Sequence, residues 1–227
     1  QLEAEATDLL YEGDHVVGAG WIDLTTGQEY RTHAAATVVA TGGFLRDLER
    51  VRALRPELAD IPLRYASWPG ADGNGLELLL GAGAATQNLE AIGLYAHGMA
   101  HPTVEGGYLG LPFAASAMWV NTDGNRFVDE STTNSFVTGE LLSFQPGGVA
   151  WVVGDADVNN FGELGVEDRG GLFTVADLVS LGEVFEATEL AGLAEPTLVP
   201  EPALLAEASG FNAFIAGESE DTFRNVP

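Results

Sequence analysis

The hydrophobic pattern of the first 33 residues predicts a small antiparallel meander. Apolar and polar residues alternate in three runs, and turn-forming residues separate them, Glu-Gly-Asp at 12–14 and Thr-Thr-Gly at 25–27. Both breaks have the length and chemistry of hairpin turns. Three strands are therefore expected, at residues 2–10, 15–23 and 28–33.

Residues 37–44, Thr-Val-Val-Ala-Thr-Gly-Gly-Phe, predict a short buried strand that ends in a glycine turn. Two β-branched residues lead into Gly42 and Gly43, where no Cβ keeps a neighbour away from the backbone. Such a turn is suited to pressing against a ligand. Many strands also end in Gly-Gly as a plain turn, so this motif leaves both interpretations open.

Two helices are expected next, one after Phe44 that Pro56 ends and one over residues 76–80. The arginines of the first helix are expected on a solvated face. Gly73-Asn74-Gly75 precedes the second helix. Glycines at that position leave helix N–H groups free to face an anion such as a pyrophosphate, and a tight turn is the alternative.

The texture of the chain changes near Leu89 to aromatic and glycine-rich, which predicts the start of a second unit. An Asp-Gly pair at 123–124 predicts a turn. Residues 195–200 are acidic, contain proline and are expected to be a linker. The remaining elements are strands at 118–120 and 149–153 and helices at 175–181 and 201–214.

The chain is strongly acidic, with 34 Asp and Glu against 9 basic residues, all of them arginine, and a formal charge of −25. Nucleic acid and anionic membrane surfaces would be repelled. There is no cysteine, which excludes disulfides, thiolate metal sites and a cysteine nucleophile. No apolar run is long enough to span a membrane, and no signal peptide is evident. A soluble protein, cytoplasmic rather than exported, is expected.

Three motifs taken in order resemble the FAD-binding flavoproteins of the fumarate reductase and succinate dehydrogenase family. They are Ala-Thr-Gly-Gly-Phe at 40–44, Gly-x-Gly with a helix and Gly-Ala at 73–84, and Asn-x-x-Gly-x-Arg-Phe-x-x-Glu at 121–130. The resemblance implies an α/β fold with an α+β second unit. Residues 1–90 would be part of a Rossmann-like FAD-binding domain with an appended meander, and 91–227 a truncated capping domain that holds substrate.

The resemblance also implies a cofactor, FAD, and the residues that contact it: Ala40, Thr41, Gly42, Gly43, Gly73, Asn74 and Gly75. Asn74 stands where the family has Asp, which keeps a hydrogen-bonding side chain but loses a charge. The chain lacks the Gly-x-Gly-x-x-Gly turn for the ADP half of FAD. Residues 1–227 alone are therefore expected to bind flavin weakly and to be inactive.

Two histidines are candidate catalytic residues. His101, in His-Pro-Thr, resembles the family's substrate-contacting histidine, and His97 resembles one in tricarballylate-dehydrogenase-like relatives. Either histidine is equally consistent with an ordinary hydrogen-bonded loop residue. They do not predict a metal site, because Gly98 and Pro102 disfavour the helix that would stack the two rings.

The chain departs from true fumarate reductases at Asn134, where the resemblance implies an arginine proton donor. Arg126 is expected to be a structural partner of Asp129 or Glu130 rather than a catalyst. We therefore expect an FAD-dependent oxidoreductase that transfers hydride between flavin and a carbon–carbon bond of a small organic acid, served by an unknown electron donor or acceptor. The alternative is a non-catalytic module that binds a small acid or a partner protein.

Overall fold

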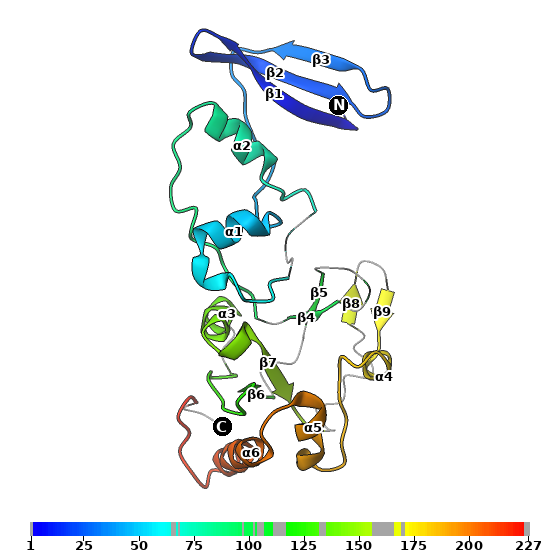
Figure 1. The fold of residues 1–227 in the computed structure, drawn as a ribbon, viewed down its shortest axis with the longest axis vertical. Helices are drawn as coiled ribbons and strands as arrows, with labels where there is room; N and C mark the ends of the chain where they lie inside the picture. The colour runs from blue at the N-terminus through cyan, green and yellow to red at the C-terminus, as the bar shows by residue number, and fades with distance from the viewer. Residues whose placement is uncertain are drawn as a thin grey trace. The chain divides into compact units, whose positions relative to one another are not determined.

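The computed structural model contains two compact units, which we describe separately (Figure 1). Unit 1 comprises Gln1–Leu54 and Ser67–Ala91, and unit 2 comprises Arg55–Ala66 and Ile92–Pro227. The assignment of 1–90 to a cofactor domain and of 91–227 to a capping domain stays a prediction. The structure describes residues 2–64, 67, 69–96, 98–101, 103, 107–110, 117–131, 135–155, 166–168 and 171–224.

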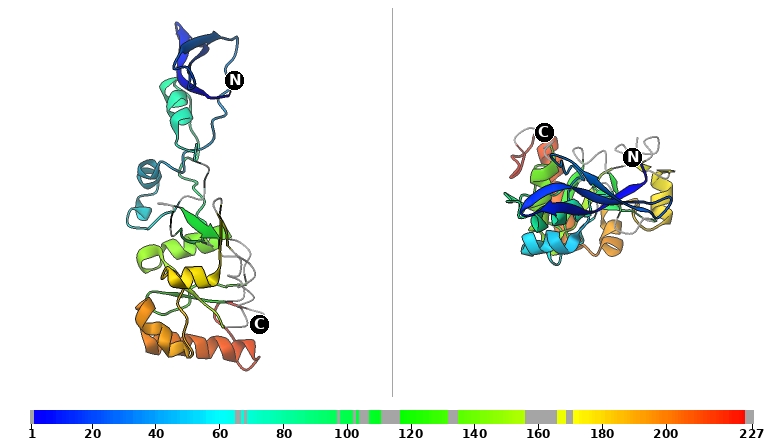
Figure 2. Two further views of the ribbon diagram at one scale, coloured as in Figure 1. Left: turned by 90° about the vertical axis from the view of Figure 1, so that its right-hand side faces the viewer. Right: turned by 90° about the horizontal axis from the view of Figure 1, so that it is seen from above.

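The predicted meander is confirmed in unit 1 (Figure 2). The strands are β1 (Ala4–Glu12), β2 (His15–Asp23) and β3 (Glu29–His33), antiparallel in the order β1-β2-β3. Trp21 and Tyr30 stack across the β2-β3 pair with ring centroids 4.3 Å apart. The Asp23 carboxylate accepts the backbone N–H groups of Thr25 and Thr26, which shapes the turn between these strands.

The strand expected within residues 37–44 is absent, so that prediction is wrong. Val38 is 87% exposed, and residues 34–44 join no sheet. A parallel strand exists only where a neighbouring strand takes up its N–H and C=O groups. Every sheet in the described part of the chain is antiparallel, so the parallel sheet implied by a Rossmann-like domain is not observed there.

The two helices predicted for unit 1 are confirmed as α1 (Leu48–Leu54) and α2 (Asn74–Gly81). Arg55, directly before Pro56, has φ −128° and ψ 75°, outside the helical region, as the proline ring requires of its predecessor. A short 3₁₀ turn, η1 (Pro56–Leu58), follows in unit 2.

Unit 2 combines three two-stranded antiparallel sheets with short helices. The expected strands at 118–120 and 149–153 are confirmed as β6 and β7, which pair with Val120 opposite Trp151. The expected linker at 195–200 is partly wrong, because its first residues form α5. The elements of unit 2 are β4 (Gly98–Ala100), β5 (Tyr108–Gly110), β6 (Met118–Asn121), α3 (Ser135–Ser143), η3 (Pro146–Gly148), β7 (Ala150–Val153), β8 (Val166–Asp168), β9 (Gly171–Phe173), α4 (Val175–Ser180), η5 (Leu190–Leu193), α5 (Ala194–Thr197) and α6 (Glu201–Ile215).

Two apolar clusters hold unit 2 together. In the first, Met118 and Val120 of β6 pack against Val199 and Leu204, so α6 covers one face of the β6-β7 pair. In the second, Ala96, Trp119 and Val128 are buried together, with Leu142 of α3 packed against them. Strand β6 therefore contributes alternate residues to two different clusters, as the period of two in a strand dictates.

The turn after β6 shows how one motif is built. Asn121 accepts the backbone N–H groups of Asp123 and Asn125 at 3.0 Å each, and Gly124 has φ +86°. The predicted Asp-Gly turn is confirmed, and glycine is required there by its positive φ.

In the part of the chain that the structure describes, no helix has the length and apolar character needed to cross a lipid bilayer.

Gly210 gives a stability prediction. It lies inside α6, and a Cβ built there meets nothing within 4 Å. We expect Gly210→Ala to raise the free energy of unfolding by about 0.5–1 kcal/mol, because alanine loses less backbone entropy in a helix. Gly124→Ala, with positive φ and a Cβ 2.7 Å from that of Ala203, should instead lower it. Urea unfolding of both variants measures the difference, and equal shifts would contradict the helix assignment.

Candidate functional site

In unit 1 the glycine turn lies directly beside the mouth of α2. The Gly73 N–H donates to the carbonyl of Gly43 at 3.3 Å, and the Arg46 N–H donates to the carbonyl of Ala71 at 2.9 Å. These two bonds run the segments 43–46 and 71–73 side by side. The two glycine segments singled out in the sequence are thus brought together.

Two of these glycines are required by the protein's own packing. A Cβ at Gly75 would lie 1.7 Å from Oγ1 of Thr41, so only glycine lets the helix approach the turn this closely. Gly73 has φ +85°, and a Cβ there would lie 3.1 Å from that of Phe44. Gly73 and Gly75 therefore shape the site from within.

Gly42 and Gly43 differ, because their surroundings are open. Gly42 has φ +90°, and a Cβ at either residue would meet nothing within 4 Å. Among the residues that the structure describes, no neighbour explains the missing side chain at Gly43, whose φ is ordinary. Bare backbone that faces open space is the arrangement a flat or extended ligand such as FAD needs, and these residues fit that group.

The mouth of α2 carries a carboxylate that the sequence reasoning missed. Asp72 accepts the backbone N–H of Asn74 at 3.0 Å and its side-chain amide at 2.8 Å. The N–H of Asn74 is therefore not free to face an anion, as was expected, and the charge of Asp72 would repel a phosphate placed there. Ligand hydroxyls suit this position better. The sequence did contain a signal for this contact, because an aspartate commonly accepts the backbone N–H two residues further on.

The same contact gives a reason for Asn74 itself. Its side-chain amide donates to Asp72, a bond that a carboxylate at position 74 would replace with repulsion between like charges. The carboxylate at the helix mouth is present in this chain but comes from position 72.

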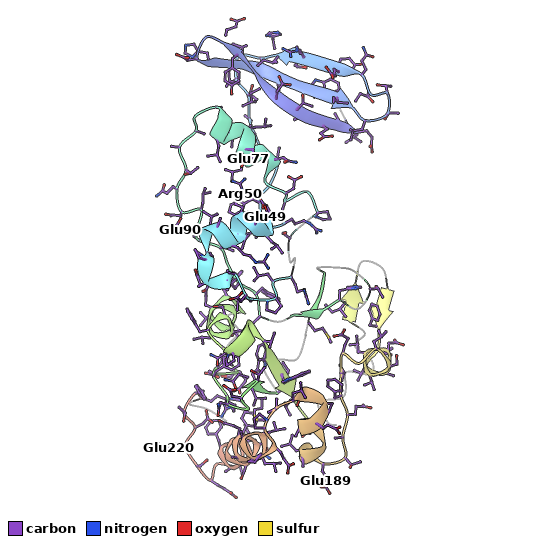
Figure 3. The ribbon with its side chains drawn as sticks, in the orientation of Figure 1. Glu49, Arg50, Glu77, Glu90, Glu189 and Glu220 are labelled. Atoms are coloured by element: carbon purple, nitrogen blue, oxygen red, sulfur yellow. The ribbon has the colours of Figure 1, made fainter. Side chains whose placement is uncertain are left out.

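Arg50 of α1 forms an ion pair with Glu77 of α2 and so ties the two helices together (Figure 3). Its Nε donates to Asp47 at 3.0 Å, and its other end pairs with Glu77. The backbone hydrogen bond from Arg50, assisted by its side chain, holds the pKa of Asp47 below its usual value. That carboxylate therefore stabilises the fold above its unfolded pKa and loses this contribution as the pH falls through the lowered one.

The expectation of a solvated face for the arginines of this helical run is wrong for Arg55, and Arg50 is also held by carboxylates. Arg55 donates to the Glu140 carboxylate at 3.1 and 2.9 Å and to the carbonyl of Ile92 at 3.1 Å, all within unit 2. Hydrogen bonds from the guanidinium to Glu140 and then Glu57 raise the pKa of Arg55. Partners remote in sequence, which periodicity cannot indicate, hold both side chains.

His101 is buried in unit 2, with 8% of its surface exposed. Its Nδ1 accepts the backbone N–H of Thr103 at 3.1 Å, and its ring meets Phe173 edge-on at 5.6 Å. With Nδ1 acting as an acceptor, Nε2 is the donor nitrogen of the ring. His97 and Asn134 lie outside the described residues. The catalytic roles of both histidines stay predictions.

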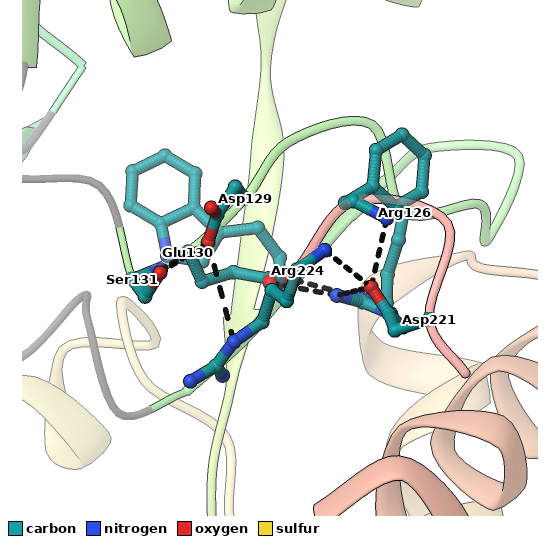
Figure 4. Close-up of polar contacts among 8 residues, drawn as sticks. Arg126, Asp129, Glu130, Ser131, Asp221 and Arg224 are labelled. Atoms are coloured by element: carbon teal, nitrogen blue, oxygen red, sulfur yellow. Dashed lines mark hydrogen bonds and ion pairs between the residues drawn. The ribbon is translucent and has the colours of Figure 1, made fainter. Parts of the chain in front are cut away.

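The most strongly buried polar cluster surrounds Arg126 (Figure 4). Arg126 donates to both oxygens of Glu130 at 2.7 and 2.8 Å and to both oxygens of Asp221. The three side chains are 3%, 0% and 6% exposed, respectively. The expected pairing of Arg126 with Glu130 is confirmed, whereas the contact with Asp221, 95 positions away, was not predicted.

Burial alone would raise the pKa of Asp221, but the hydrogen bonds from Arg126 and from the N–H groups of Arg224 and Phe223 outweigh it and leave that pKa below its usual value. Burial alone would lower the pKa of Arg126, but the hydrogen bonds that it donates to Glu130 and Asp221 outweigh this and leave that pKa raised. Arg126 and Asp221 therefore both stay charged at neutral pH.

Aromatic rings close this cluster. The guanidinium of Arg126 lies 4.8 Å from the ring centre of Phe211, and that of Arg224 lies 5.5 Å from the same ring. Asp129 is 4.0 Å from Nε of Arg224. The motif at 121–130 and the residues after α6 thus form one packed structure, which suits a supporting role rather than proton transfer.

Among the described residues there is no group of three or more His, Asp or Glu side chains arranged to hold a metal ion. Ala40, the first of the predicted cofactor contacts, is exposed beside the turn.

Glu130 gives a second stability prediction. Glu130→Gln should lower the free energy of unfolding by about 3 kcal/mol, because it leaves the buried Arg126 with a single carboxylate. The matched control is Glu220→Gln, since Glu220 is exposed and should shift stability by under about 0.5 kcal/mol. Chemical denaturation of both variants is the measurement, and equal effects would remove the special status of this ion pair.

Comparison with known proteins agrees with this geometry. A family model described as "FAD binding domain" matches residues 1–214. The cytochrome-type fumarate reductase of Shewanella frigidimarina is 29% identical over 204 residues, which is 87% of this chain and 32% of that protein. A probable fumarate reductase of the same bacterium is 27% identical over 98% of this chain and 35% of its own length. The NADH:fumarate oxidoreductase of Klebsiella pneumoniae is 27% identical over 98% of this chain and 22% of its own.

The chain thus spans about a third or less of the curated relatives it matches. Distant homology to fumarate reductase flavoproteins extends over most of the chain, and the family model covers both glycine segments, His101 and the Arg126 motif. On this match, and on the paired glycine segments of unit 1, the chain belongs to the FAD binding domain family.

Proposed function

We propose that this chain is part of an FAD-dependent oxidoreductase that transfers hydride between the flavin and a carbon–carbon bond of a small organic acid. The observation that carries the proposal is the open backbone at Gly42 and Gly43 beside the mouth of α2. It occurs in a chain that matches the FAD binding domain family. The resemblance to fumarate reductases supports the class of reaction.

The residues of the glycine turn and of the mouth of α2 each have a defined role in this proposal. Gly42 and Gly43 let the cofactor lie against the main chain, and Thr41, Gly73 and Gly75 hold the turn and the helix mouth together. Asp72, oriented by the amide of Asn74, accepts hydrogen bonds from cofactor hydroxyls. Bound FAD would supply hydride transfer at its isoalloxazine ring. The protein would hold the cofactor in position and keep side chains away from the backbone at Gly42 and Gly43.

His101 is the proposed substrate-binding residue, with His97 as its rival. The bond from the Thr103 N–H to Nδ1 places the imidazole proton on Nε2, from which it donates to a carboxylate or carbonyl oxygen. Phe173 fixes the ring from its edge. In this proposal the histidine binds and orients the substrate acid, and it does not transfer a proton.

The proton donor of true fumarate reductases has no counterpart at Asn134, because an amide cannot deliver a proton. Arg126 does not replace this proton donor, because each nitrogen of its guanidinium group donates to Glu130 or Asp221. This disfavours fumarate reduction by that mechanism, and hydride transfer in either direction needs another group to give or take the proton on the neighbouring carbon. The electron donor or acceptor is a further partner whose chemistry the residues do not specify.

A second candidate function is a non-catalytic module of the same fold that binds a small acid or a partner protein. The observation that favours it is Asn134 in place of the proton donor. The full-length protein distinguishes the two functions. Its flavin is photoreduced, and unsaturated acids such as fumarate are added in turn, followed by saturated acids with the oxidised flavin. Reoxidation or reduction by any of them supports the enzyme, and inertness to all supports the binding module.

The cofactor assignment predicts a flavin-binding defect in Gly43→Ala. A methyl group there meets no protein atom, so the fold should be unaffected while a cofactor against the turn is displaced. We expect flavin affinity to fall by about tenfold or more, which corresponds to about 1.4 kcal/mol. Flavin absorbance per protein after purification and titration of the apoprotein measure it.

Gly81→Ala is the matched control, because Gly81 ends α2 and is equally open. Equal flavin content in both variants would contradict the proposed position of the cofactor. A full-length protein that purifies without any yellow chromophore, and takes up none, would reject FAD itself.

A further inference from the structure

Helix α3 packs against residues 93–96, and the segment 92–96 leads into the histidines of unit 2. At the centre of this contact a Cβ on Gly139 would lie 2.3 Å from the carbonyl oxygen of Leu94. The opposing segment contributes a glycine as well, since a Cβ on Gly93 would lie 2.9 Å from the ring of Phe136. The two main chains therefore approach more closely than residues with side chains allow.

Polar and aromatic contacts fix the ends of the same segment. Arg55 bridges the carbonyl of Ile92 to the carboxylate of Glu140 in α3 with bonds of 2.9 to 3.1 Å. Tyr95 meets Phe136 edge-on, with ring centroids 6.4 Å apart. Segment and helix are thus joined at several independent points.

The contact continues toward His101. Ala96 is buried with Trp119 and Val128, and Leu142 of α3 packs against this cluster. Strand β4 begins two residues later, and the backbone N–H of His101, directly after β4, donates to the carbonyl of Gly107 at 3.1 Å. In sequence four residues separate Ala96 from His101, and three of them form β4.

We propose that α3 positions the histidine-bearing segment and that Gly139 is the positioning residue that sets their separation. The inference rests on the proposed function, in which His101 binds the substrate acid. A methyl group at position 139 must displace the Leu94 carbonyl by about 1 Å to reach an ordinary contact. Displacements of that size are known to reduce turnover about a hundredfold where a substrate-binding group moves.

The test compares two glycine-to-alanine substitutions in helices of unit 2, in the full-length protein. Gly139→Ala meets the Leu94 carbonyl, whereas Gly210→Ala in α6 meets nothing within 4 Å. We expect the Gly139 variant to lose about a hundredfold in kcat/KM while its flavin content stays normal. The Gly210 variant should stay within about twofold of the parent, and a normal value for Gly139→Ala would overturn the proposal.

A second readout does not depend on activity. The ring-proton NMR signals of His101 report its position directly, and Gly139→Ala should shift them while Gly210→Ala leaves them in place. If the parent turns over no acid, the proposed function fails and these signals still decide the positioning role. Lost stability with unmoved His101 signals would mean that Gly139 serves packing alone, which overturns the proposal.

If Gly139→Ala does not fold, Glu140→Gln takes its place, because Glu140 is partly exposed and its change preserves shape. It weakens the bridge from α3 to Ile92, and we expect a shift of the His101 signals with a fall in kcat/KM of severalfold. The matched control is Glu57→Gln, which removes the other carboxylate on Arg55 without touching α3. Equal behaviour of the two variants would overturn the proposal.

Discussion

The candidate site of unit 1 depends on one close approach, that of α2 to the Thr41 side chain at Gly75. The helix reaches the turn only because position 75 has no Cβ. With the helix in place, the Gly73 N–H bonds to Gly43, and the turn presents its bare backbone outward. The missing side chain at Gly75 thus allows the helix to pack against the turn, and the missing side chain at Gly43 leaves open space beside the turn.

Unit 2 is organised by a buried charge rather than by a bare backbone. Arg126 would be costly to bury alone, and two carboxylates together with the ring of Phe211 compensate for the loss of water. Because Glu130 also accepts the N–H of Trp119, the ion cluster is connected to β6 and through Trp119 to the apolar cluster around Ala96. The residues that follow α6 close this structure through Asp221. The charged residues of the motif at 121–130 are therefore paired with one another and with Asp221, which suits a supporting role.

The two units therefore contribute different groups to the proposed chemistry. Unit 1 offers open backbone and the carboxylate of Asp72, which suit a cofactor with hydroxyl groups. Unit 2 offers a histidine whose tautomer is set by Thr103, supported by a segment that α3 holds along its length. Asn134 removes one familiar proton donor, so relatedness to fumarate reductases by itself does not decide the direction of the reaction.

The sequence by itself determined the local elements, because they follow from local chemistry. Residues close together in the sequence determine the meander, the end of α1 before Pro56 and the turn at Gly124. They also determine the pairing of Arg126 with Glu130, four residues on. The glycine motifs also identified the family. Tertiary structure alone decided that residues 37–44 form no strand, since a strand needs a partner from elsewhere in the chain. It likewise decided that Asp221 completes the Arg126 cluster and that Gly139 admits Leu94, because contacts between remote residues leave no periodic trace in sequence.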